Sequence, residues 1–465
     1  TNMVADWLER RLPPLHAAAI PDGLPKPDRI LPVLRGTIGD VLADYLNDPD
    51  AAMPVMDLRA NAAAVDFLAS VDLATASGHG VASPDHVLRT KRLPLVLDTR
   101  TLRAGEKAIH AAVACFVDDY RAYFDRNVSR FGDEKRMVSP HPCVAWIEGI
   151  GVLGIGANAQ AANAAADLAE QTLVVIRRAE AAGGFRPIDE TDTFACEYWS
   201  LEQAKLGKGK LPAFTGRVVL VTGGAGTIGL ATAKAFAAQG AQIFLVDRDE
   251  HALAAALDRL GRWHGGIACD ITADGGPEGA MTACVERFGG LDILVSNAGT
   301  AVPGDISTMS DATLRRSFEL NFFAHNAFAQ AAIRVFRAQG RGGQILFNIS
   351  KQAVNPGKGL GAYGLPKATT FFLLRQLALE LGAEGIRVNG VNADRIRSGL
   401  LNDDFIAERA KARGVDEAAY MANNILEKEV EAHHVAKAFV DLACSDRTTA
   451  HVMTVDGGNI EAALR

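Results

Sequence analysis

The second half of the chain alternates short apolar runs with longer amphipathic ones. From residue 217 onward, the short runs are rich in β-branched residues, and the longer runs carry Ala and Leu at helical spacing. Short runs that are apolar throughout indicate strands covered on both faces, and their alternation with helices is typical of βαβ units. Seven strands are predicted, at residues 217–223, 241–247, 265–270, 292–299, 342–350, 385–392 and 450–458. They predict an α/β fold with a Rossmann-type, doubly wound parallel sheet of seven strands.

The first part of the chain shows a different pattern. One strand-like apolar run covers 144–156, and a long Ala-rich helix is predicted over 159–184, where Gly183 and Gly184 are expected to stop it. Further helical periodicity is found at 36–47, 61–69 and 105–127. These elements predict a smaller α/β domain.

The boundary between the two patterns is marked by composition. The segment GKGKLPAFTG is rich in Gly, Lys and Pro and has no periodicity, which is typical of a linker. The sequence therefore predicts three parts, at residues 1–206, 207–216 and 217–465.

The composition limits the kinds of partner that the protein can have. Hydrophobic residues make up 48% of the 465 residues and charged residues 22%, as in soluble globular proteins. The net charge of −7 argues against nucleic acid and anionic membranes as partners and favours a small-molecule substrate. Six widely spaced cysteines form no C-x-x-C pair, and the N-terminus does not resemble a secretory signal, so we expect a cytoplasmic protein with reduced thiols.

The first predicted strand of the second domain leads into a glycine-rich turn and then a helix. Such a turn places backbone N–H groups and the positive end of the helix dipole at one point, which suits the pyrophosphate of a dinucleotide. The predicted contacts lie in TGGAGTIG, at Thr222, Gly223, Gly226, Thr227, Ile228 and Gly229.

The ends of the following strands carry further candidate cofactor contacts. Asp247 ends the second strand, where its carboxylate can accept both ribose hydroxyls, so NAD is expected in preference to NADP. Arg248 beside it leaves the 2′-phosphate of NADP as the alternative. Adenine and nicotinamide contacts are predicted at the ends of the third and fourth strands, at Asp270, Ile271, Asn297, Ala298 and Gly299.

A candidate acid/base group follows the fifth strand. Tyr363 and Lys367 are four residues apart, which places them on one helix face, and Ser350 lies thirteen residues upstream of the tyrosine. A phenol has a pKa near 10, and a neighbouring ammonium is expected to lower it by stabilising the phenolate. The Ser350 hydroxyl can hold a substrate oxygen, and Asn321 can anchor a water that links Lys367 to solvent.

With these motifs in place, the second domain resembles the short-chain dehydrogenase/reductase family. The resemblance rests on TGxxGxxG, NAG, YxxxK and VDGG (455–458), together with Asn321 and Ser350. It implies that Tyr363 is the general acid/base, that Lys367 lowers its pKa and binds the nicotinamide ribose, and that Asn321 completes a proton relay. It also implies a homodimer or homotetramer, formed through helices that begin near Asp311 and Ala362.

The sequence departs from the family pattern at three places. Thr227 stands where the commonest spacing of compact members has glycine, with the glycine at Gly226 instead, as in the family's extended branch. The usual NISS is NISK, so that alignment by the doublet would place Lys351, not Ser350, at the hydroxyl position; the thirteen-residue spacing favours Ser350. The Pro-Gly expected after the sixth strand is Ala393-Asp394, which affects the contact to the nicotinamide carboxamide.

The charged segment from residue 395 to 431 falls where a substrate lid is expected. Arg395, Arg397 and Lys411 are either solvated lid charges, which we favour, or ligands of an anionic substrate.

The first domain resembles class II aldolases, in the stretch from residue 141 to 181. Two further segments, 82–98 and 196–206, resemble bacterial fusions of the rhamnulose-1-phosphate aldolase/alcohol dehydrogenase type. Those fusions carry an additional N-terminal aldolase segment, which is expected to be missing here. Class II aldolases hold a divalent metal with an H-x-H pair and a third histidine, and the chain has no H-x-H. We therefore expect no metal site and a non-catalytic first domain; the histidines weighed as ligands are His79, His86, His141, His433 and His434.

Taken together, the sequence predicts an NAD-dependent oxidoreductase that interconverts an alcohol and a carbonyl, such as a lactaldehyde-like compound or a sugar-derived polyol. Two alternatives stay open: a bifunctional aldolase/dehydrogenase of deoxy-sugar catabolism, and a catalytically silent NAD-binding sensor or structural protein.

Overall fold

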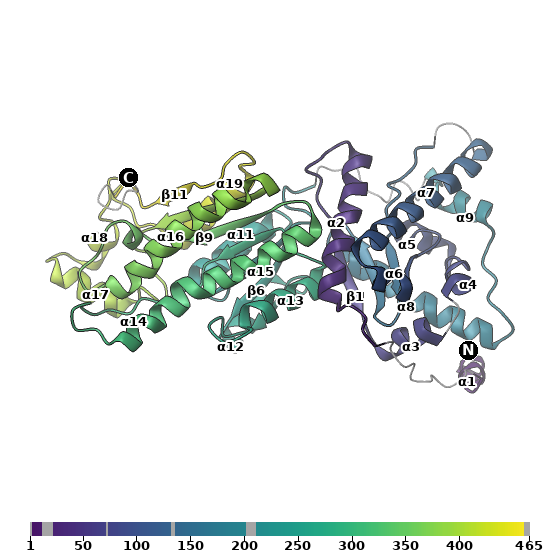
Figure 1. The fold of residues 1–465 in the computed structure, drawn as a ribbon, viewed down its shortest axis with the longest axis horizontal. Coiled ribbons are helices and arrows are strands. Elements are labelled where there is room, and N and C mark those ends of the chain that lie inside the picture. Colours follow the sequence, from purple (N-terminus) through teal and green to yellow (C-terminus); the bar gives the residue numbers. More distant parts are fainter. Residues whose placement is uncertain (1, 12–21, 71–72, 132–134, 201–210, 460–465) are drawn as a thin grey trace. The chain divides into compact units, whose positions relative to one another are not determined.

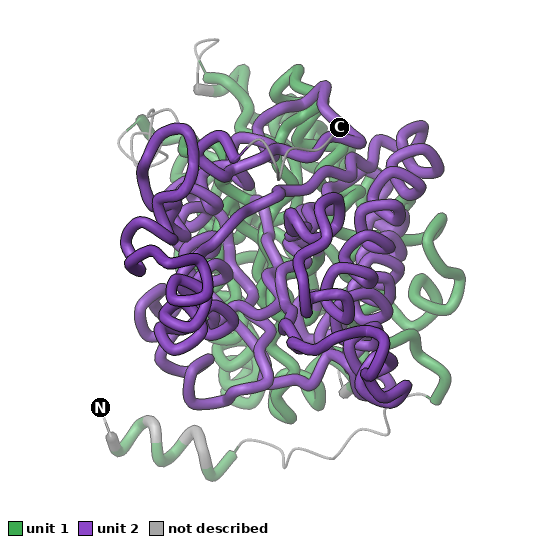
Figure 2. The backbone as a smooth tube through the Cα atoms, turned by 90° about the vertical axis from the view of Figure 1, so that its left-hand side faces the viewer, with its two compact units in different colours: residues 1–216, 286–290 green, residues 217–285, 291–465 purple. Residues whose placement is uncertain are grey.

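The computed structural model describes residues 2–11, 22–70, 73–131, 135–200 and 211–459. The chain divides into two compact units, which Figure 2 colours separately: residues 1–216 with 286–290, and residues 217–285 with 291–465. Of the predicted linker, residues 207–210 lie outside the described residues, and residues 213–216 form a turn.

The second unit is built on a seven-stranded parallel sheet, which confirms the predicted fold class. The strand order is β11-β10-β9-β8-β5-β6-β7, and every ladder in it is parallel. Each strand falls within a predicted run: β5 Val218–Thr222, β6 Gln242–Asp247, β7 Gly265–Ala268, β8 Ile293–Ser296, β9 Gly343–Asn348, β10 Ile386–Ala393 and β11 Val452–Val455. The order reverses between β5 and β8, and ligands of open α/β sheets bind at such a switch point.

Helices cover both faces of this sheet (Figure 1). On one face α11 packs against α12 and α19, and on the other α15 packs against α16. The core between the layers is apolar because β5, β8 and the centre of β9 are buried throughout. The helices are α11 Thr227–Ala238, α12 Glu250–Leu260, α13 Gly276–Phe288, α14 Asp311–Phe318, α15 Ala324–Gln339, α16 Gly361–Leu381, α17 Asp403–Ala412, α18 Glu417–Met421 and α19 Ala432–Cys444, with short turns η3 Glu319–Phe323, η4 Lys351–Ala353 and η5 Gly382–Glu384.

The first unit contains a four-stranded mixed sheet in the order β1-β4-β3-β2. Strands β1 and β3 run antiparallel to β4, whereas β2 runs parallel to β3. The elements of this unit are α1 Asn2–Glu9, α2 Pro27–Leu46, β1 Val55–Arg59, α3 Ala62–Ser70, α4 Leu73–Ser77, η1 Pro84–His86, α5 Val87–Thr90, β2 Leu95–Leu97, α6 Thr99–Ala104, α7 Glu106–Phe131, β3 Val144–Ile147, β4 Gly151–Gly156, α8 Ala159–Ala181 and α9 Glu190–Glu197.

One prediction for the first unit needs correction. The apolar run 144–156 is not one strand but two, β3 and β4, joined by a turn in which Gly149 has a φ of 73°. Both strands are buried on both faces, so the run shows no alternation that would reveal the turn. Strands β1 and β2 were not predicted at all.

The long helix α8 is confirmed, and small residues determine where it packs. A Cβ at Gly154 of β4 would overlap the carbonyl oxygen of Ala162, so glycine on the strand and alanine on the helix let the two backbones approach closely. Within the described residues, no helix is both long and apolar enough to cross a membrane.

Candidate functional site

The carboxyl ends of the parallel strands open onto a cleft of ≈ 940 Å³. This volume lies at the upper end of the range for small-molecule and cofactor sites. All of the predicted site residues except Thr222 and Asn321 line the cleft.

The glycine turn between β5 and α11 is tight at two positions. Gly223 has a φ of 62°, and a Cβ there would lie 3.0 Å from the Cα of Ala298. A Cβ at Gly229 would overlap the carbonyl oxygen of Gly223. Gly226, the residue before α11, makes no side-chain cap, so the first N–H groups of the helix are open to an anion. This arrangement fits the pyrophosphate of a dinucleotide.

The departure at Thr227 has no steric consequence. Thr227 is the first residue of α11, has helical geometry and is exposed. Its side chain lines the cleft instead of meeting the turn. The close contacts that require glycine therefore fall on Gly223 and Gly229, and the threonine hydroxyl adds a polar group beside the helix terminus.

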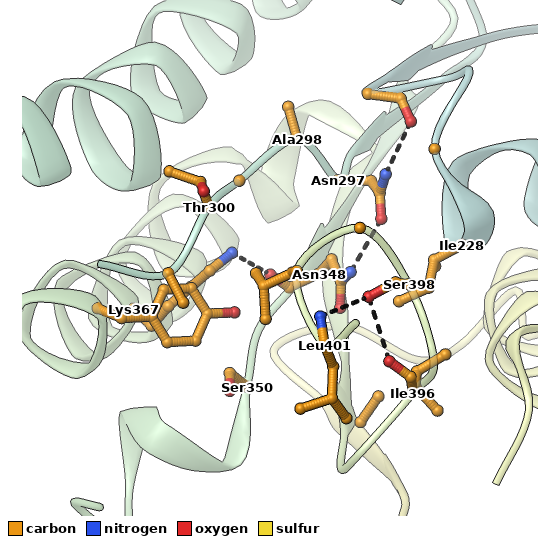
Figure 3. Close-up of a pocket in the computed structure, with 18 of the residues that line it drawn as sticks. Ile228, Asn297, Ala298, Thr300, Asn348, Ser350, Lys367, Ile396, Ser398 and Leu401 are labelled. Carbon is orange, nitrogen blue, oxygen red and sulfur yellow. Dashed lines mark hydrogen bonds between the residues drawn. The ribbon is translucent and has the colours of Figure 1, made fainter. Parts of the chain in front are cut away.

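Three side chains tie the ends of β5, β8 and β9 together. The Thr222 hydroxyl accepts hydrogen bonds from the backbone N–H groups of Asn297 (2.9 Å) and Ala298 (3.1 Å). The Asn297 side chain donates to the carbonyl of Thr222 (3.0 Å), and Asn348 donates to Asn297 (2.9 Å; Figure 3). Thr222 thus positions the cleft wall without lining it.

The predicted adenosine end lies along β6 and the residues after β7. The Asp247 carboxylate accepts hydrogen bonds from the backbone N–H groups of Ala225 (3.0 Å) and Asp249 (3.2 Å), which fix its direction. Hydrogen bonds from Thr272 lower the pKa of the Asp270 carboxyl, and Arg248 beside it lowers that pKa further. Ile271 is buried against the same wall. Carboxylates therefore dominate this end of the cleft.

The predicted reactive groups meet at the ends of β9 and α16. Burial raises the pKa of Tyr363, and the nearby side chain of Ser350 lowers it in part. Both residues line the cleft, and Ser350 stays the predicted residue at the hydroxyl position. The sequence-based expectation of a lowered pKa is therefore not met in the protein alone, because desolvation of the phenol outweighs its partner.

Lys367 is buried one helical turn from the tyrosine. Its ammonium donates to the carbonyl oxygen of Asn348 at 2.8 Å (Figure 3) and lies 5.8 Å from the centre of the Tyr363 ring. Burial lowers the pKa of Lys367 to about 8. The amine is thus mostly protonated at neutral pH, and it loses its proton at a pH only slightly above neutral.

Asn321 lies in a π-helical turn, η3, that precedes α15. Its side chain donates to the carbonyl oxygens of Thr300 (3.0 Å) and Ser317 (3.1 Å), and its own carbonyl accepts from Thr370 (2.9 Å). A Cβ at Gly299 would lie 2.8 Å from its side-chain oxygen and 3.7 Å from the Lys367 ammonium, so Gly299 allows these groups to converge. Asn321 fixes the loop that carries the nicotinamide end of the cleft.

Two departures from the family pattern meet in one ion pair. Lys351, after the catalytic serine position, pairs with Asp394, which replaces the expected glycine after β10. The sequence analysis noted Lys351 and Asp394 separately but did not predict that they pair. The opposite charges of the two residues could have indicated the ion pair. Arg395, next to Asp394, adopts a φ of 45°, a backbone conformation that is strained for a residue with a side chain.

The three cations weighed in the segment 395–431 lie in different places. Arg395 lines the cleft, whereas Arg397 and Lys411 lie outside it; Arg397 pairs with Asp403 and Glu429. Arg409 and Arg413, which the sequence analysis did not single out, line the cleft from the end of α17.

A buried histidine that the sequence analysis did not consider lies behind the reactive groups. His325 accepts or donates a 2.6 Å hydrogen bond with Ser296 at the end of β8. Burial holds the pKa of His325 well below its usual value, and nearby Lys367 lowers it further, so the imidazole is neutral. The imidazole does not line the cleft, and its hydrogen bond to Ser296 anchors it to the end of β8.

Among the histidines weighed as metal ligands, His433 and His434 lie side by side, with ring centres 3.8 Å apart. His79 faces Glu180 at 3.5 Å, and His141 is hydrogen-bonded to Ser139 at 2.7 Å, with burial lowering its pKa to about 3. Among the described residues, no group of three or more His, Cys, Asp or Glu side chains is arranged to hold a metal ion.

Comparison with known proteins decides the family. A model described as "short chain dehydrogenase" matches residues 217–408. Short-chain dehydrogenase reductase 5 of Arabidopsis thaliana is 34% identical over 260 residues, which cover 52% of this chain and 94% of that protein. The chain belongs to the short-chain dehydrogenase/reductase family. Members of this family are oxidoreductases that bind NAD(P) and act on small molecules.

The part before the short-chain dehydrogenase domain has a match of its own. A model described as "Aldolase class II, second domain" matches residues 25–206. The chain is also similar to the uncharacterized oxidoreductase YuxG of Bacillus subtilis, 30% identical over 454 residues, which cover 92% of this chain and 63% of YuxG. The chain therefore spans less than two thirds of that relative. An aldolase class II domain thus precedes the dehydrogenase domain.

Among solved structures, levodione reductase resembles the dehydrogenase domain. It is 25% identical, with a TM-score of 0.50, and the match covers 54% of this chain and 100% of that chain.

The glycine turn yields a prediction about which positions need glycine. Gly229→Ala forces a methyl group onto the Gly223 carbonyl, so we expect NADH to bind at least about 10-fold more weakly and the protein to lose about 1–3 kcal/mol of stability. Thr227→Gly, the matched control, is expected to change the NADH dissociation constant by less than about 3-fold. Fluorescence titration and thermal unfolding measure both effects. Normal NADH binding by Gly229→Ala, or markedly tighter binding by Thr227→Gly, would contradict this account.

Proposed function

We propose that the dehydrogenase domain is an NAD-dependent alcohol dehydrogenase or carbonyl reductase for a small hydroxyl or carbonyl compound. One observation carries the proposal: Ser350, Tyr363 and Lys367 all line the same cleft that the glycine turn opens, with the Lys367 ammonium 5.8 Å from the centre of the Tyr363 ring. These are the groups needed to hold an oxygen and to move its proton.

The raised pKa of Tyr363 defines its resting state. Because burial disfavours the phenolate, the phenol carries its proton at neutral pH and is ready to donate it to a carbonyl oxygen. Ser350, whose side chain lies near the phenol, offers a second group to the same oxygen. Bound NAD(H) supplies or accepts the hydride.

In the direction of alcohol oxidation, Tyr363 must first lose its proton. The positive charge of Lys367 favours the phenolate when it forms, because the low dielectric of the buried site strengthens the attraction. The carbonyl oxygen of Asn348 holds the ammonium in place. The proposed role of Lys367 is therefore to reduce the cost of ionising a phenol that burial has made weakly acidic.

The test of this proposal is Tyr363→Phe. Removing the hydroxyl leaves the packing of the ring but no proton donor, so we expect turnover to fall about 10²–10⁴-fold. The assay follows absorbance at 340 nm over a panel of hydroxy acids, polyols, aldoses and lactaldehyde. Thermal stabilisation by NADH serves as the control and should be retained.

Two outcomes would count against the assignment. Turnover by Tyr363→Phe close to that of the parent would remove Tyr363 as the acid/base. Stabilisation of the parent protein by NADH, without turnover of any panel member, would favour the silent NAD-binding alternative.

We further propose that the cofactor is NAD and not NADP. Asp247 is held by two backbone N–H groups with its carboxylate in the cleft, where it can accept ribose hydroxyls and would repel a phosphate. Arg248 lies close to Asp270 and interacts with its carboxylate, so its charge is less available to bind a 2′-phosphate.

Asp247→Ser tests the cofactor preference. Because the substitution removes charge-assisted hydrogen bonds and the repulsion together, we expect the KM for NAD to rise about 10–100-fold and the preference to shift towards NADP. Asp249→Ser, at a neighbouring carboxylate that does not line the cleft, is the control. An unchanged ratio of kcat/KM for the two cofactors would refute the proposal.

The dehydrogenase domain is also proposed to form a homodimer or homotetramer through α16. Leu365, Phe372 and Leu379 recur every seven residues on one face of this helix, with 48%, 62% and 81% of their surfaces exposed. Phe323, before α15, is 50% exposed. An apolar stripe of this kind is typical of an interface.

Phe372→Glu tests the interface. A charge in the middle of the stripe should lower the mass measured by light scattering to that of the monomer, whereas Val415→Glu, also at an exposed apolar residue, should not. An oligomer unaffected by Phe372→Glu would place the interface elsewhere.

A further inference from the structure

One end of the cleft holds more positive charge than its carboxylate can neutralise. We call this the basic end. It consists of Lys351 at the start of η4, Arg395 after β10, and Arg409 and Arg413 at the end of α17, around Asp394. The chain as a whole carries a net charge of −7, so this concentration of cations is local.

Asp394 is already fully used. One of its oxygens pairs with Lys351, and the other accepts a hydrogen bond from the side chain of Asn459 at 2.7 Å. The Nε atom of Arg395 lies 3.7 Å from that second oxygen, beyond hydrogen-bonding distance. Both oxygens of the only carboxylate in the basic end therefore already have partners, Lys351 and Asn459.

Arg395 is buried without a full set of partners. Its side chain is only 9% exposed, and its Nε atom has no hydrogen-bond partner among the described residues. Its Nη1 atom donates to the carbonyl oxygens of Tyr420 (2.6 Å) and Asn423 (3.3 Å), which are neutral acceptors. A buried guanidinium with an unpaired donor is costly unless a ligand satisfies it.

The aromatic ring of Tyr420 holds a second guanidinium nearby. Arg395 lies 4.8 Å and Arg413 5.2 Å from the centre of this ring. Cation–π contacts position the two groups but leave their charges unneutralised. Both arginines also lower the pKa of Lys351, after the larger effect of burial, which shows that the three cations interact.

Elsewhere in the same segment, cations do have partners. Arg397 contacts both Asp403 and Glu429 at 2.9 Å and lies outside the cleft. By contrast, no carboxylate of the described residues lies within ion-pair distance of Arg409 or Arg413. Arg397 is thus paired outside the cleft, whereas Arg409 and Arg413 line the cleft without a carboxylate partner among the described residues.

We infer that the substrate carries an anionic group that the basic end binds, and that a phosphate monoester fits it best. This inference rests on the proposed function, because it assigns the substrate of the same site. The four cations of the basic end with Asp394 leave three formal positive charges, enough to neutralise a phosphate dianion. Arginines also present paired N–H donors that fit phosphate oxygens.

Apart from Asp394, which stands where a contact to the nicotinamide carboxamide is expected, the basic end is distinct from the predicted cofactor contacts. Those lie at the glycine turn, where α11 begins, and at Asp247 on β6, whereas the basic end is built from η4, the loop after β10 and α17. Experiments at saturating NADH or NAD therefore probe the substrate anion and not the cofactor phosphates.

The experiment compares pairs of related substrates, of which one member carries an anionic group and the other does not. The probes are glyceraldehyde against glyceraldehyde 3-phosphate, glycerol against glycerol 3-phosphate, and 2-butanol against 3-hydroxybutyrate, assayed with the full chain at saturating cofactor. We expect kcat/KM for the phosphorylated member to exceed that for its neutral partner by at least about 10-fold.

Arg413→Met is the informative variant because this arginine makes no side-chain hydrogen bond in the described structure that folding would lose. It should reduce the phosphate preference by about 10-fold, mainly through KM. Lys411→Met removes a charge two residues away on α17, outside the cleft, and should leave the preference unchanged. Equal turnover of charged and neutral members, or equal effects of the two variants, would overturn the inference while leaving the oxidoreductase proposal intact.

A binding measurement separates the two proposals when no probe turns over. With NADH saturating, glycerol 3-phosphate should raise the unfolding temperature of the parent protein more than glycerol does, and Arg413→Met should abolish the difference. That result without turnover would support the anion site and refute the proposed function. No difference in the parent would refute the anion site. A preference for 3-hydroxybutyrate that depends on Arg413 would support an anionic substrate and overturn the phosphate assignment.

Discussion

The alignment of the carboxyl ends of β5, β8 and β9 is the constraint on which the cleft depends. Thr222 and Asn297 bond the first two ends together, and Asn348 bonds the third to them. The same Asn348 accepts the Lys367 ammonium on its carbonyl oxygen. A shift of any of these strands by one residue would turn its side chains to the other face and break this chain of contacts. The cofactor turn and the proton-transfer groups are therefore fixed by one set of hydrogen bonds.

Much of this arrangement could be predicted because it is local in sequence. Each parallel strand is a continuous apolar run, and Tyr363 and Lys367 are related by a single helical turn. The hairpin at β3 and β4 could not be predicted in the same way, since burial on both faces removes the alternation that marks a turn. The raised pKa of Tyr363 also escaped prediction, because spacing shows which charges are near but not how much water the fold removes.

The pair of Lys351 and Asp394 shows a different limit of sequence analysis. Each residue taken alone is a departure from a family motif, and the two lie on separate strand ends. Only the adjacency of β9 and β10 in the sheet brings them together. Similarly, Arg409 and Arg413 look like ordinary lid charges until α17 is placed over the cleft, while Arg397 and Lys411 are directed elsewhere. Helical spacing alone does not determine which of these cations a substrate meets.

Buried positive charge links the two ends of the active cleft. Lys367 keeps its ammonium in a site where burial lowers its pKa to about 8, and Arg395 keeps a guanidinium in a site that leaves one donor unpaired. A protein selected for stability alone would replace such groups by apolar ones, because the free-energy penalty of desolvating a charge exceeds the stabilisation from most single contacts. Their positions are consistent with two separate electrostatic tasks. In the proposed reaction, Lys367 would face the place where a phenolate forms, whereas Arg395 would face the charge that arrives with the substrate. The first charge would act on the transition state, and the second on binding and orientation.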